Sequence, residues 1–344
     1  MVLVLGVSAG AGGARAILTH SDQPHLPPID RCRVPRRAGG GVEEAVFEAI
    51  RQMRRSADHR DELVTGTAVT CRCPLHADAI RAAAGYQPLT IVSEPLAQLR
   101  YLRFTRQLPE EGTVLLYDLG SSGLTLTLVD CRTDSIISSK RSTVLGGDGF
   151  DALLRWQLAR DGILTDKLSC RRHREALSID RVVTAMDGNS GGRAVLTRSD
   201  VTELCAAGVQ HSVSFVHQLI EQSETPPQAL VLLGGCTRSP SIQETLAAAV
   251  DLPMIYDPEP EAVASRGAVL LATGRSAAEL RTTRPGLRQL APAADRRKLI
   301  AALAVTATLG ATIAGVLVMD RDTTPGHDST VPTPAEIAGT PTGR

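Results

Sequence analysis

The sequence predicts an α/β protein of two lobes, each starting with a repeated β-hairpin, followed by one C-terminal transmembrane helix. Three observations lead to this prediction. The chain has 344 residues, 43% hydrophobic and 22% charged, which is enough for two lobes with their own cores. The pattern of residues 1–18 recurs 110 residues further along the chain. Near the end, residues 299–319 form a run of 21 uncharged residues.

Charge and cysteine content exclude several classes of protein. Lysine plus arginine and aspartate plus glutamate both number 37, so the net charge is zero and we expect no nucleic-acid partner. The seven cysteines are odd in number and form no CxxC pair, which is typical of a reducing cytoplasm. We interpret Cys71 and Cys73, a CxC pair, as packed strand residues rather than metal ligands.

The repeated hairpins have small residues at their turns. Residues 8–13, Ser-Ala-Gly-Ala-Gly-Gly, align with residues 118–123, Asp-Leu-Gly-Ser-Ser-Gly, and apolar runs flank both segments. Taken alone, each segment fits an ordinary hairpin equally well. Small turns expose successive backbone N–H groups, however, and such concavities bind anions. Two facing turns therefore predict a phosphate clamp, with these residues: Gly10, Ala11, Gly12, Gly120, Ser121 and Ser122.

Further segments supply helices and strands in order. Residues 42–53 repeat apolar residues at helical spacing and predict an amphipathic helix. The pair Glu94-Pro95 opens another helix, because proline and an acid both suit the first turn. After Gly146-Gly147-Asp148 we expect a helix that buries Phe150, Leu153, Leu154 and Leu158, with Trp156 as a core anchor. The remaining predicted elements are a strand near 229–233, a helix from Ser239-Pro240 and a helix within 257–274.

Five ordered segments resemble one known family. They are SEPLAQ (93–98), DLGSSG (118–123), LGGDGFD (145–151), LLGGCTRSP (232–240) and PEAVASRGA (260–268). Together they resemble the nucleotide-binding domain of the DnaK-type 70-kilodalton heat-shock chaperones, within the actin and hexokinase superfamily. The resemblance covers about 1–274 and implies a two-lobed actin-like ATPase fold with duplicated mixed β-sheets. Lobe I would span about 1–112 and lobe II about 113–274, closing on ATP or ADP with Mg²⁺.

The resemblance also implies roles for individual residues. Asp118 matches the acid that handles magnesium and the attacking water, and Glu94 matches an acid near the waters of the metal. The implied nucleotide-binding residues are the second phosphate loop (Gly120, Ser121, Ser122), a Gly-Gly-acid turn (Gly146, Gly147, Asp148), the adenosine motif (Gly234, Gly235, Arg238) and an adenine-clasping helix end (Arg174, Ser178). Glu175 stands where the family has an arginine.

Departures from the family predict impaired hydrolysis. Ser8 stands where the first lobe of the family carries an acid, and Thr125 replaces a second acid. No lysine precedes Lys140, so the phosphate-reaching role is empty or falls to an arginine such as Arg36 or Arg37. Asp118 alone would hold magnesium more weakly. Because phosphoryl transfer depends on positioned charge, we expect weak or absent ATP hydrolysis.

The C-terminal region predicts membrane attachment. As a helix, residues 299–319 would span about 31 Å, which matches a bilayer core of about 30 Å. Basic residues at 296–298 place residues 1–298 in the cytoplasm by the positive-inside rule. Residues 275–298 would be a basic juxtamembrane linker and 320–344 a disordered external tail. Small residues at 310, 311, 314 and 315 favour self-association of the helix, and a buried core helix is the alternative interpretation.

These features lead to one expected function and two alternatives. We expect a membrane-anchored, heat-shock-70-like module that binds ATP or ADP and acts as a conformational sensor or chaperone-like adaptor for cytoplasmic or membrane protein partners. One alternative is a nucleotide-free pseudo-ATPase scaffold that docks partners in cell-envelope, division or secretion machinery. The other is an active chaperone ATPase, or a sugar or metabolite kinase of the superfamily, which would need a replacement acid in the first lobe.

Overall fold

The computed structural model describes residues 2–282 of the chain. The predicted transmembrane helix (299–319), the predicted external tail (320–344) and most of the predicted linker (275–298) lie outside this range. Among the described residues, no helix has both the length and the apolar character that crossing a bilayer requires. The membrane anchor therefore stays a prediction.

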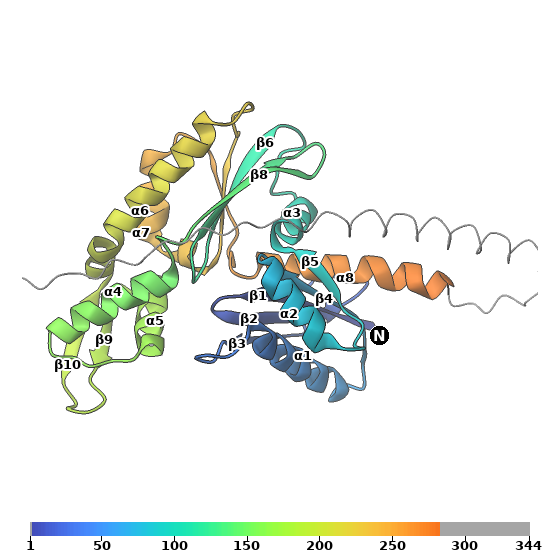
Figure 1. Ribbon diagram of the computed structural model, residues 1–344, viewed down its shortest axis with the longest axis horizontal. Coiled ribbons are helices and arrows are strands. Elements are labelled where there is room, and N and C mark those ends of the chain that lie inside the picture. The colour runs from blue at the N-terminus through green and yellow to red at the C-terminus, as the bar shows by residue number, and fades with distance from the viewer. Residues whose placement is uncertain (1, 283–344) are drawn as a thin grey trace, which may run out of the picture. The chain divides into compact units, whose positions relative to one another are not determined.

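The first lobe is built on a five-stranded mixed sheet in the order β3-β2-β1-β4-β5. Its strands are β1 (Val2–Gly10), β2 (Gly13–His20), β3 (Asp30–Pro35), β4 (Leu63–Cys71) and β5 (Thr90–Ser93). The first three strands run antiparallel, whereas β4 and β5 are parallel to β1. Helices α1 (Val42–Asp58) and α2 (Pro74–Ala84) cover one face, and α8 (Val263–Thr282) covers the other (Figure 1). Because side chains alternate along β1, Leu5 packs toward α1 and Val4 toward α8.

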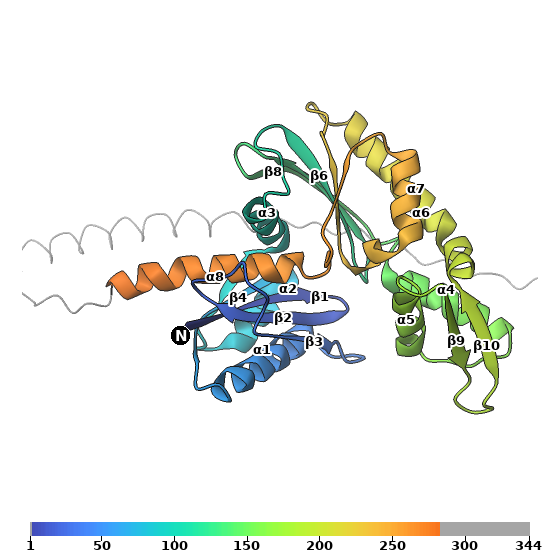
Figure 2. The ribbon, with the colours of Figure 1, turned by 180° about the vertical axis from the view of Figure 1, so that it is seen from behind.

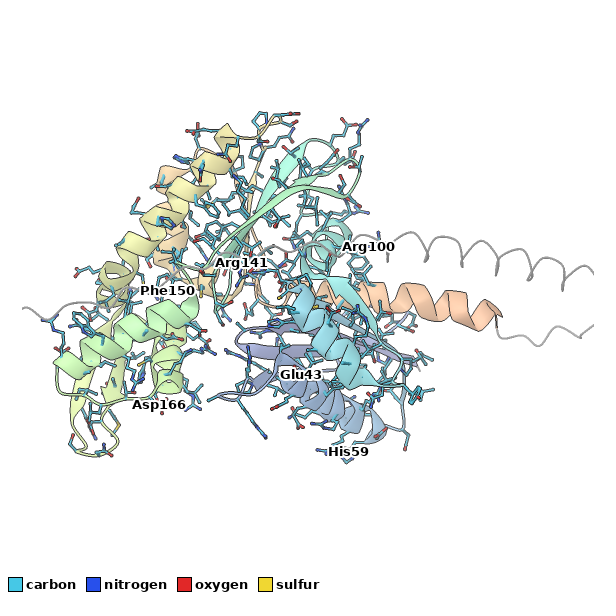
Figure 3. The ribbon with its side chains drawn as sticks, viewed as in Figure 1. Glu43, His59, Arg100, Arg141, Phe150 and Asp166 are labelled. Carbon is cyan, nitrogen blue, oxygen red and sulfur yellow. The ribbon has the colours of Figure 1, made fainter. Side chains whose placement is uncertain are left out.

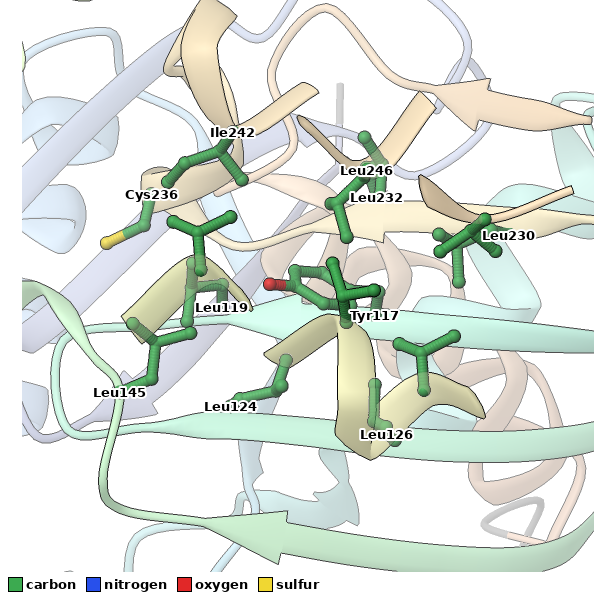
Figure 4. Close-up of a cluster of buried hydrophobic side chains, with 14 of the residues drawn as sticks. Tyr117, Leu119, Leu124, Leu126, Leu145, Leu230, Leu232, Cys236, Ile242 and Leu246 are labelled. Carbon is green, nitrogen blue, oxygen red and sulfur yellow. The ribbon is translucent and has the colours of Figure 1, made fainter. Parts of the chain in front are cut away.

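The second lobe repeats this plan in the order β12-β11-β6-β7-β8. Its strands are β6 (Thr113–Leu119), β7 (Leu124–Asp130), β8 (Ser135–Ser142), β11 (Leu230–Leu233) and β12 (Met254–Tyr256). Helices α6 (Arg198–Glu221) and α7 (Pro240–Ala249) cover one face, and α3 (Glu94–Phe104) covers the other. On the first face Tyr117 is fully buried in the core (Figure 4), and its hydroxyl donates to Ser212 Oγ at 2.8 Å.

The two sheets have the same topology, which confirms the repeat expected from the sequence. In both, three antiparallel strands are followed by two strands parallel to the first. Ala9 pairs with Ala14 at the first turn and Leu119 with Leu124 at the second, a shift of 110 residues in both members. Two five-stranded mixed sheets flanked by helices are consistent with the two-lobed actin-like ATPase fold.

A larger insertion distinguishes the second lobe. Between β8 and β11 the chain forms α4 (Gly147–Arg160), α5 (Lys167–Ala176), a hairpin of β9 (Val182–Met186) and β10 (Arg193–Thr197), and then α6. The equivalent segment of the first lobe, between β3 and β4, contains α1 alone. Two predictions on α4 are wrong, since Leu153 is 42% and Trp156 57% exposed. The buried face of this helix packs on α5, α6 and the β9–β10 hairpin, and its opposite face is left to solvent, where Arg160 stacks on Trp156.

The lobes join where α3 and α8 pack against each other, and Figure 2 shows the two helices side by side. After β12 the chain returns to the first sheet through α8, which contacts β1 and β4. Glycine makes this close approach feasible, because a Cβ at Gly267 would lie 1.8 Å from the Ala97 carbonyl oxygen. The lobe boundaries inferred from the sequence, 1–112 and 113–274, stay predictions.

Candidate functional site

A cavity of about 540 Å³ lies between the two lobes, and both hairpin turns line it. Residues 10–12 come from the β1–β2 turn and residues 120–122 from the β6–β7 turn. At their tips the turns approach closely, since a Cβ at Gly12 would lie 2.6 Å from Ser121 Oγ. The structure thus brings the two predicted cradles together at one cavity.

The backbone of these turns is available to a ligand. The amide N–H groups of Ala11, Gly12, Ser121 and Ser122 donate no hydrogen bond to any residue that the structure describes. Consecutive free N–H groups in a tight turn form a concavity with a positive lining, which favours phosphate or carboxylate oxygens. Both turns therefore have the chemistry of an anion cradle.

The turn at Gly146-Gly147 supports the second cradle from behind rather than lining the cavity. Gly147 N donates to Gly120 O at 3.0 Å, and Asp148 N donates to Ser121 O at 2.7 Å. A Cβ at Gly146 would lie 2.5 Å from Gly123 N, so a larger residue would displace the loop. The Asp148 carboxylate pairs with Arg171 at 2.5 Å and is thereby held away from the cavity.

At one end of the cavity an acidic pair surrounds a single arginine. Arg72 lies in the short link between β4 and α2, and its Nη2 is 2.5 Å from Asp118 Oδ2 and 2.6 Å from Glu94 Oε2. Its Nη1 donates to Thr125 Oγ1 at 2.8 Å. Gln98 Nε2 also donates to Asp118 Oδ2, at 2.5 Å. Second-lobe and α3 side chains therefore converge on one guanidinium of the first lobe.

Burial and charge set the protonation of this cluster. Burial disfavours the charged form of Arg72, but Asp118 and Glu94 outweigh this effect and raise its pKa above the ordinary value. Burial raises the pKa of Glu94 to about 7, against the opposing charge of Arg72. Asp118 shares that guanidinium, so Glu94 gains only part of its stabilisation. Glu94 is thus a carboxyl group that titrates near neutral pH.

A second arginine lies at the cavity beside the second cradle. Arg141 on β8 donates to Ser122 Oγ at 2.7 Å, beside the second cradle, and it forms no ion pair with a described residue. Figure 3 shows it where the two lobes face each other. An arginine without a carboxylate partner next to free backbone amides is suited to binding a phosphate group.

Most of the predicted adenosine residues also line the cavity. Gly234, Gly235 and Arg174 line it, with Gly235 in the short 3₁₀ turn η1 (Gly235–Arg238). Arg174 Nε donates to the buried Asp151 carboxylate at 2.7 Å. Ser178 lines a small separate pocket that shares Arg174 with the cavity, and Arg238 lies outside the cavity, paired with Glu261 at 3.0 Å.

Comparison with known proteins identifies the family. The HSP70 family model, described as "Hsp70 protein", matches residues 75–281, more than half of the chain. The chain belongs to the Hsp70 family. It is 28% identical over 289 residues to a chaperone protein HscA homolog of Azotobacter vinelandii, covering 75% of this chain and 45% of the relative.

Other relatives carry similar names. A chaperone protein HscA homolog of Paracidovorax citrulli is 25% identical over 253 residues, covering 67% of this chain and 40% of the relative. Chaperone protein HscA of Salmonella arizonae is 25% identical over 208 residues, covering 57% and 33% respectively. The chain spans less than half of the length of these relatives. What the whole relatives do therefore enters below only as a proposal.

The residues of this cavity do not form the magnesium site that the resemblance to Hsp70 implies. In the family resemblance Asp118 and Glu94 would lie near the metal and its waters, yet here both carboxylates bind Arg72. The remaining positions are neutral, since Ser8 lines the cavity in place of an acid and Thr125 accepts from Arg72. Mg²⁺ prefers carboxylate and water oxygens at about 2.0–2.1 Å, and the Arg72 guanidinium already binds one oxygen of each carboxylate.

Sequence reasoning named Arg174 but missed the two arginines beside the acidic pair and the second cradle. It considered Arg36 and Arg37 for the phosphate-reaching role, but neither lines the cavity, and Arg36 Nε donates to the Gly40 carbonyl. Arg72 and Arg141 line it instead. A signal was present for Arg72, because it directly follows β4 at the carboxyl edge of parallel strands, where ligands gather.

Proposed function

We propose that this Hsp70-family chain is a chaperone-like module that binds ATP or ADP between its two lobes. The observation that carries the proposal is the pair of duplicated turns with free amides that line one cavity. The cavity volume, about 540 Å³, falls within the range of about 300–1,000 Å³ usual for small-ligand sites. In this proposal the phosphates lie between the turns and the adenosine lies toward Gly234 and Arg174.

In this proposal nucleotide binding changes the conformation of the module, whereas hydrolysis of ATP is slow or absent. A ligand held by both turns favours a closed arrangement, because it contacts the two lobes at once only when they are close. Asp118 accepts hydrogen bonds from Arg72 and Gln98 and is not free to position an attacking water. With Ser8 and Thr125 neutral, turnover is expected to be low or absent. A conformational sensor or adaptor for protein partners follows, with residues 299–319 as its proposed membrane anchor.

Equilibrium binding to the full chain tests the proposal. Titration calorimetry with ATP and ADP is expected to give saturable binding with a Kd below about 1 mM, or about −4 kcal/mol. Arg141→Gln should weaken binding about tenfold by removing a charged contact to phosphate. Arg100→Gln on α3, exposed and outside the cavity, is the matched control and should bind like the parent chain (Figure 3). Absence of binding at millimolar nucleotide rejects the proposal.

A second candidate, the nucleotide-free scaffold, is favoured by ion pairs that already link the lobes. Arg33 on β3 pairs with Glu175 on α5, and Arg72 pairs with Asp118. These contacts link the two lobes directly through side chains. Under this alternative the chain shows no thermal shift with ATP or ADP, yet still captures protein partners.

A further inference from the structure

Four polar side chains surround the guanidinium of Arg72. Asp118, Glu94 and Thr125 contact it directly, and Gln98 binds the same oxygen of Asp118. The Arg72 side chain is only 22% exposed, so the cluster is largely shielded from solvent. Ion pairs of this kind are held tightly, because leaving either partner buried alone is costly.

Arg72 engages one oxygen of Asp118 and one of Glu94. Its Oδ2 accepts from Arg72 and Gln98. Its Oδ1 faces the backbone of residue 234, where a Cβ would come within 2.6 Å and where φ is +83°, which favours glycine. Glu94 binds the same Arg72 nitrogen through Oε2. The carboxylates near the phosphate cradles are therefore neutralised from within the chain.

Two arginines supply positive charge for a polyphosphate ligand. Arg72 offsets the acidic pair, which would otherwise repel an anion, and its Nε is buried without an acceptor among the described residues. Arg141 adds a positive charge beside Ser122. Planar guanidinium groups bind phosphate oxygens directly, and their charge is fixed at all physiological pH values. The cavity thus combines free amides with two arginines at its phosphate end.

We infer that Arg72 takes the place of the divalent cation, so that the cleft binds ATP or ADP as the metal-free polyphosphate anion. This inference rests on the proposed function, because it concerns how the same cleft holds a nucleotide. It predicts an Hsp70-family member whose nucleotide affinity is independent of magnesium. The structural basis is the convergence of Asp118 and Glu94 on one guanidinium, together with a neutral residue at position 8.

The deciding experiment compares binding with and without metal. The Kd of the full chain for ATP is measured by titration calorimetry in excess EDTA and in excess Mg²⁺. The two values are expected to agree within about threefold, whereas a metal-dependent site would differ by tenfold or more, about 1.4 kcal/mol. Binding that appears only with Mg²⁺ overturns this inference but supports the proposed function. Absence of binding in both buffers rejects the proposed function itself.

The variant Arg72→Gln gives a second test, because recovery of its ATP affinity by Mg²⁺ could not result from a loss of structure. Arg72→Gln removes the charge and exposes Asp118 and Glu94, so metal-free affinity should fall by about tenfold and Mg²⁺ should restore part of it. Arg100→Gln should keep the metal-independent behaviour of the parent chain. Unchanged metal-free binding by Arg72→Gln overturns the inference. If Arg72→Gln does not fold, Arg72→Lys tests the inference from the other direction: it keeps the positive charge and should bind ATP without metal, and binding that requires Mg²⁺ would overturn the inference.

Discussion

Arg33 on β3 and Glu175 on α5 form a two-point ion pair across the cleft, with nitrogen–oxygen distances of 3.0 and 3.1 Å. The sequence marks Glu175 as unusual, because the resembling family has an arginine there. The structure supplies the reason, since an arginine at 175 would face Arg33 with the same charge. Burial alone would raise the pKa of Glu175, but Arg33 outweighs it and holds that pKa below the ordinary value.

Breaking this pair should speed nucleotide release. Its side chains are 42% and 41% exposed, so the pair contributes about 0.5–1 kcal/mol to closure. Glu175→Gln should therefore raise the release rate of a fluorescent ATP analogue about two- to fivefold in stopped-flow measurements. The reversed pair, Arg33→Glu with Glu175→Arg, should return the rate toward that of the parent chain. Glu48→Gln removes an exposed ion pair on α1 and serves as control. An unchanged release rate in Glu175→Gln would show that this pair does not hold the lobes together.

Hydrolysis by the full chain should not depend on Asp118. Asp118→Asn keeps the shape of the side chain and an oxygen for Gln98 while removing the carboxylate charge. Because Arg72 and Gln98 already occupy that carboxylate, steady-state ATP turnover should be indistinguishable between the parent chain and the variant. An enzyme that uses such a group typically loses about 10²–10³ in kcat when one positioned contact is removed. A clear drop in ATP turnover in Asp118→Asn would contradict this prediction and support the alternative of an active ATPase or kinase.

Local patterns predicted the fold, whereas the chemistry of the site depends on distant partners. The duplicated turns were visible because small residues between apolar runs are a local signal, and both reach the cavity. The role of Arg72 was not visible, because its partners Asp118 and Thr125 are 46 and 53 residues away in the sequence. Trp156 was misplaced for a related reason, since its burial depends on which helices cover α4.

Glu94 should make stability and binding depend on pH near neutrality. Its pKa in the folded chain is about 7, above the ordinary 4.5, so between these values the folded state keeps a proton that the unfolded state releases. This contribution to stability is complete below about pH 4.5 and is lost as pH rises through 7. The Tm of Glu94→Gln relative to the parent chain should therefore increase from pH 5 to pH 8 by a few degrees, or about 1 kcal/mol or more.

Two further measurements complete this prediction. Because charged Glu94 repels phosphate, ATP affinity of the parent chain should fall as pH rises through 7, and Glu94→Gln should show a weaker dependence. Glu43→Gln, at the start of α1 and outside the cavity, is the control for general effects of removing an acid. Parallel Tm curves for the parent chain and Glu94→Gln across this pH range would contradict the raised pKa.

The junction of α3 and α8 should be intolerant of a single methyl group. In an exposed helix interior, Gly→Ala is favourable by about 1 kcal/mol, because alanine has the higher helix propensity. At Gly267 the added Cβ would lie 1.8 Å from the Ala97 carbonyl oxygen, and backbone cannot move aside as a flexible side chain would. Gly267→Ala should therefore destabilise the chain by about 1–3 kcal/mol and lower the Tm measured by calorimetry.

Gly149→Ala in α4 is the matched control, since its Cβ would meet nothing within 4 Å, and the Tm should stay equal or rise. Since α3 also carries Glu94 and Gln98, displacement of this helix in Gly267→Ala should weaken ATP binding as well. An equal Tm for the two alanine variants would show that α8 does not press on α3 at this point.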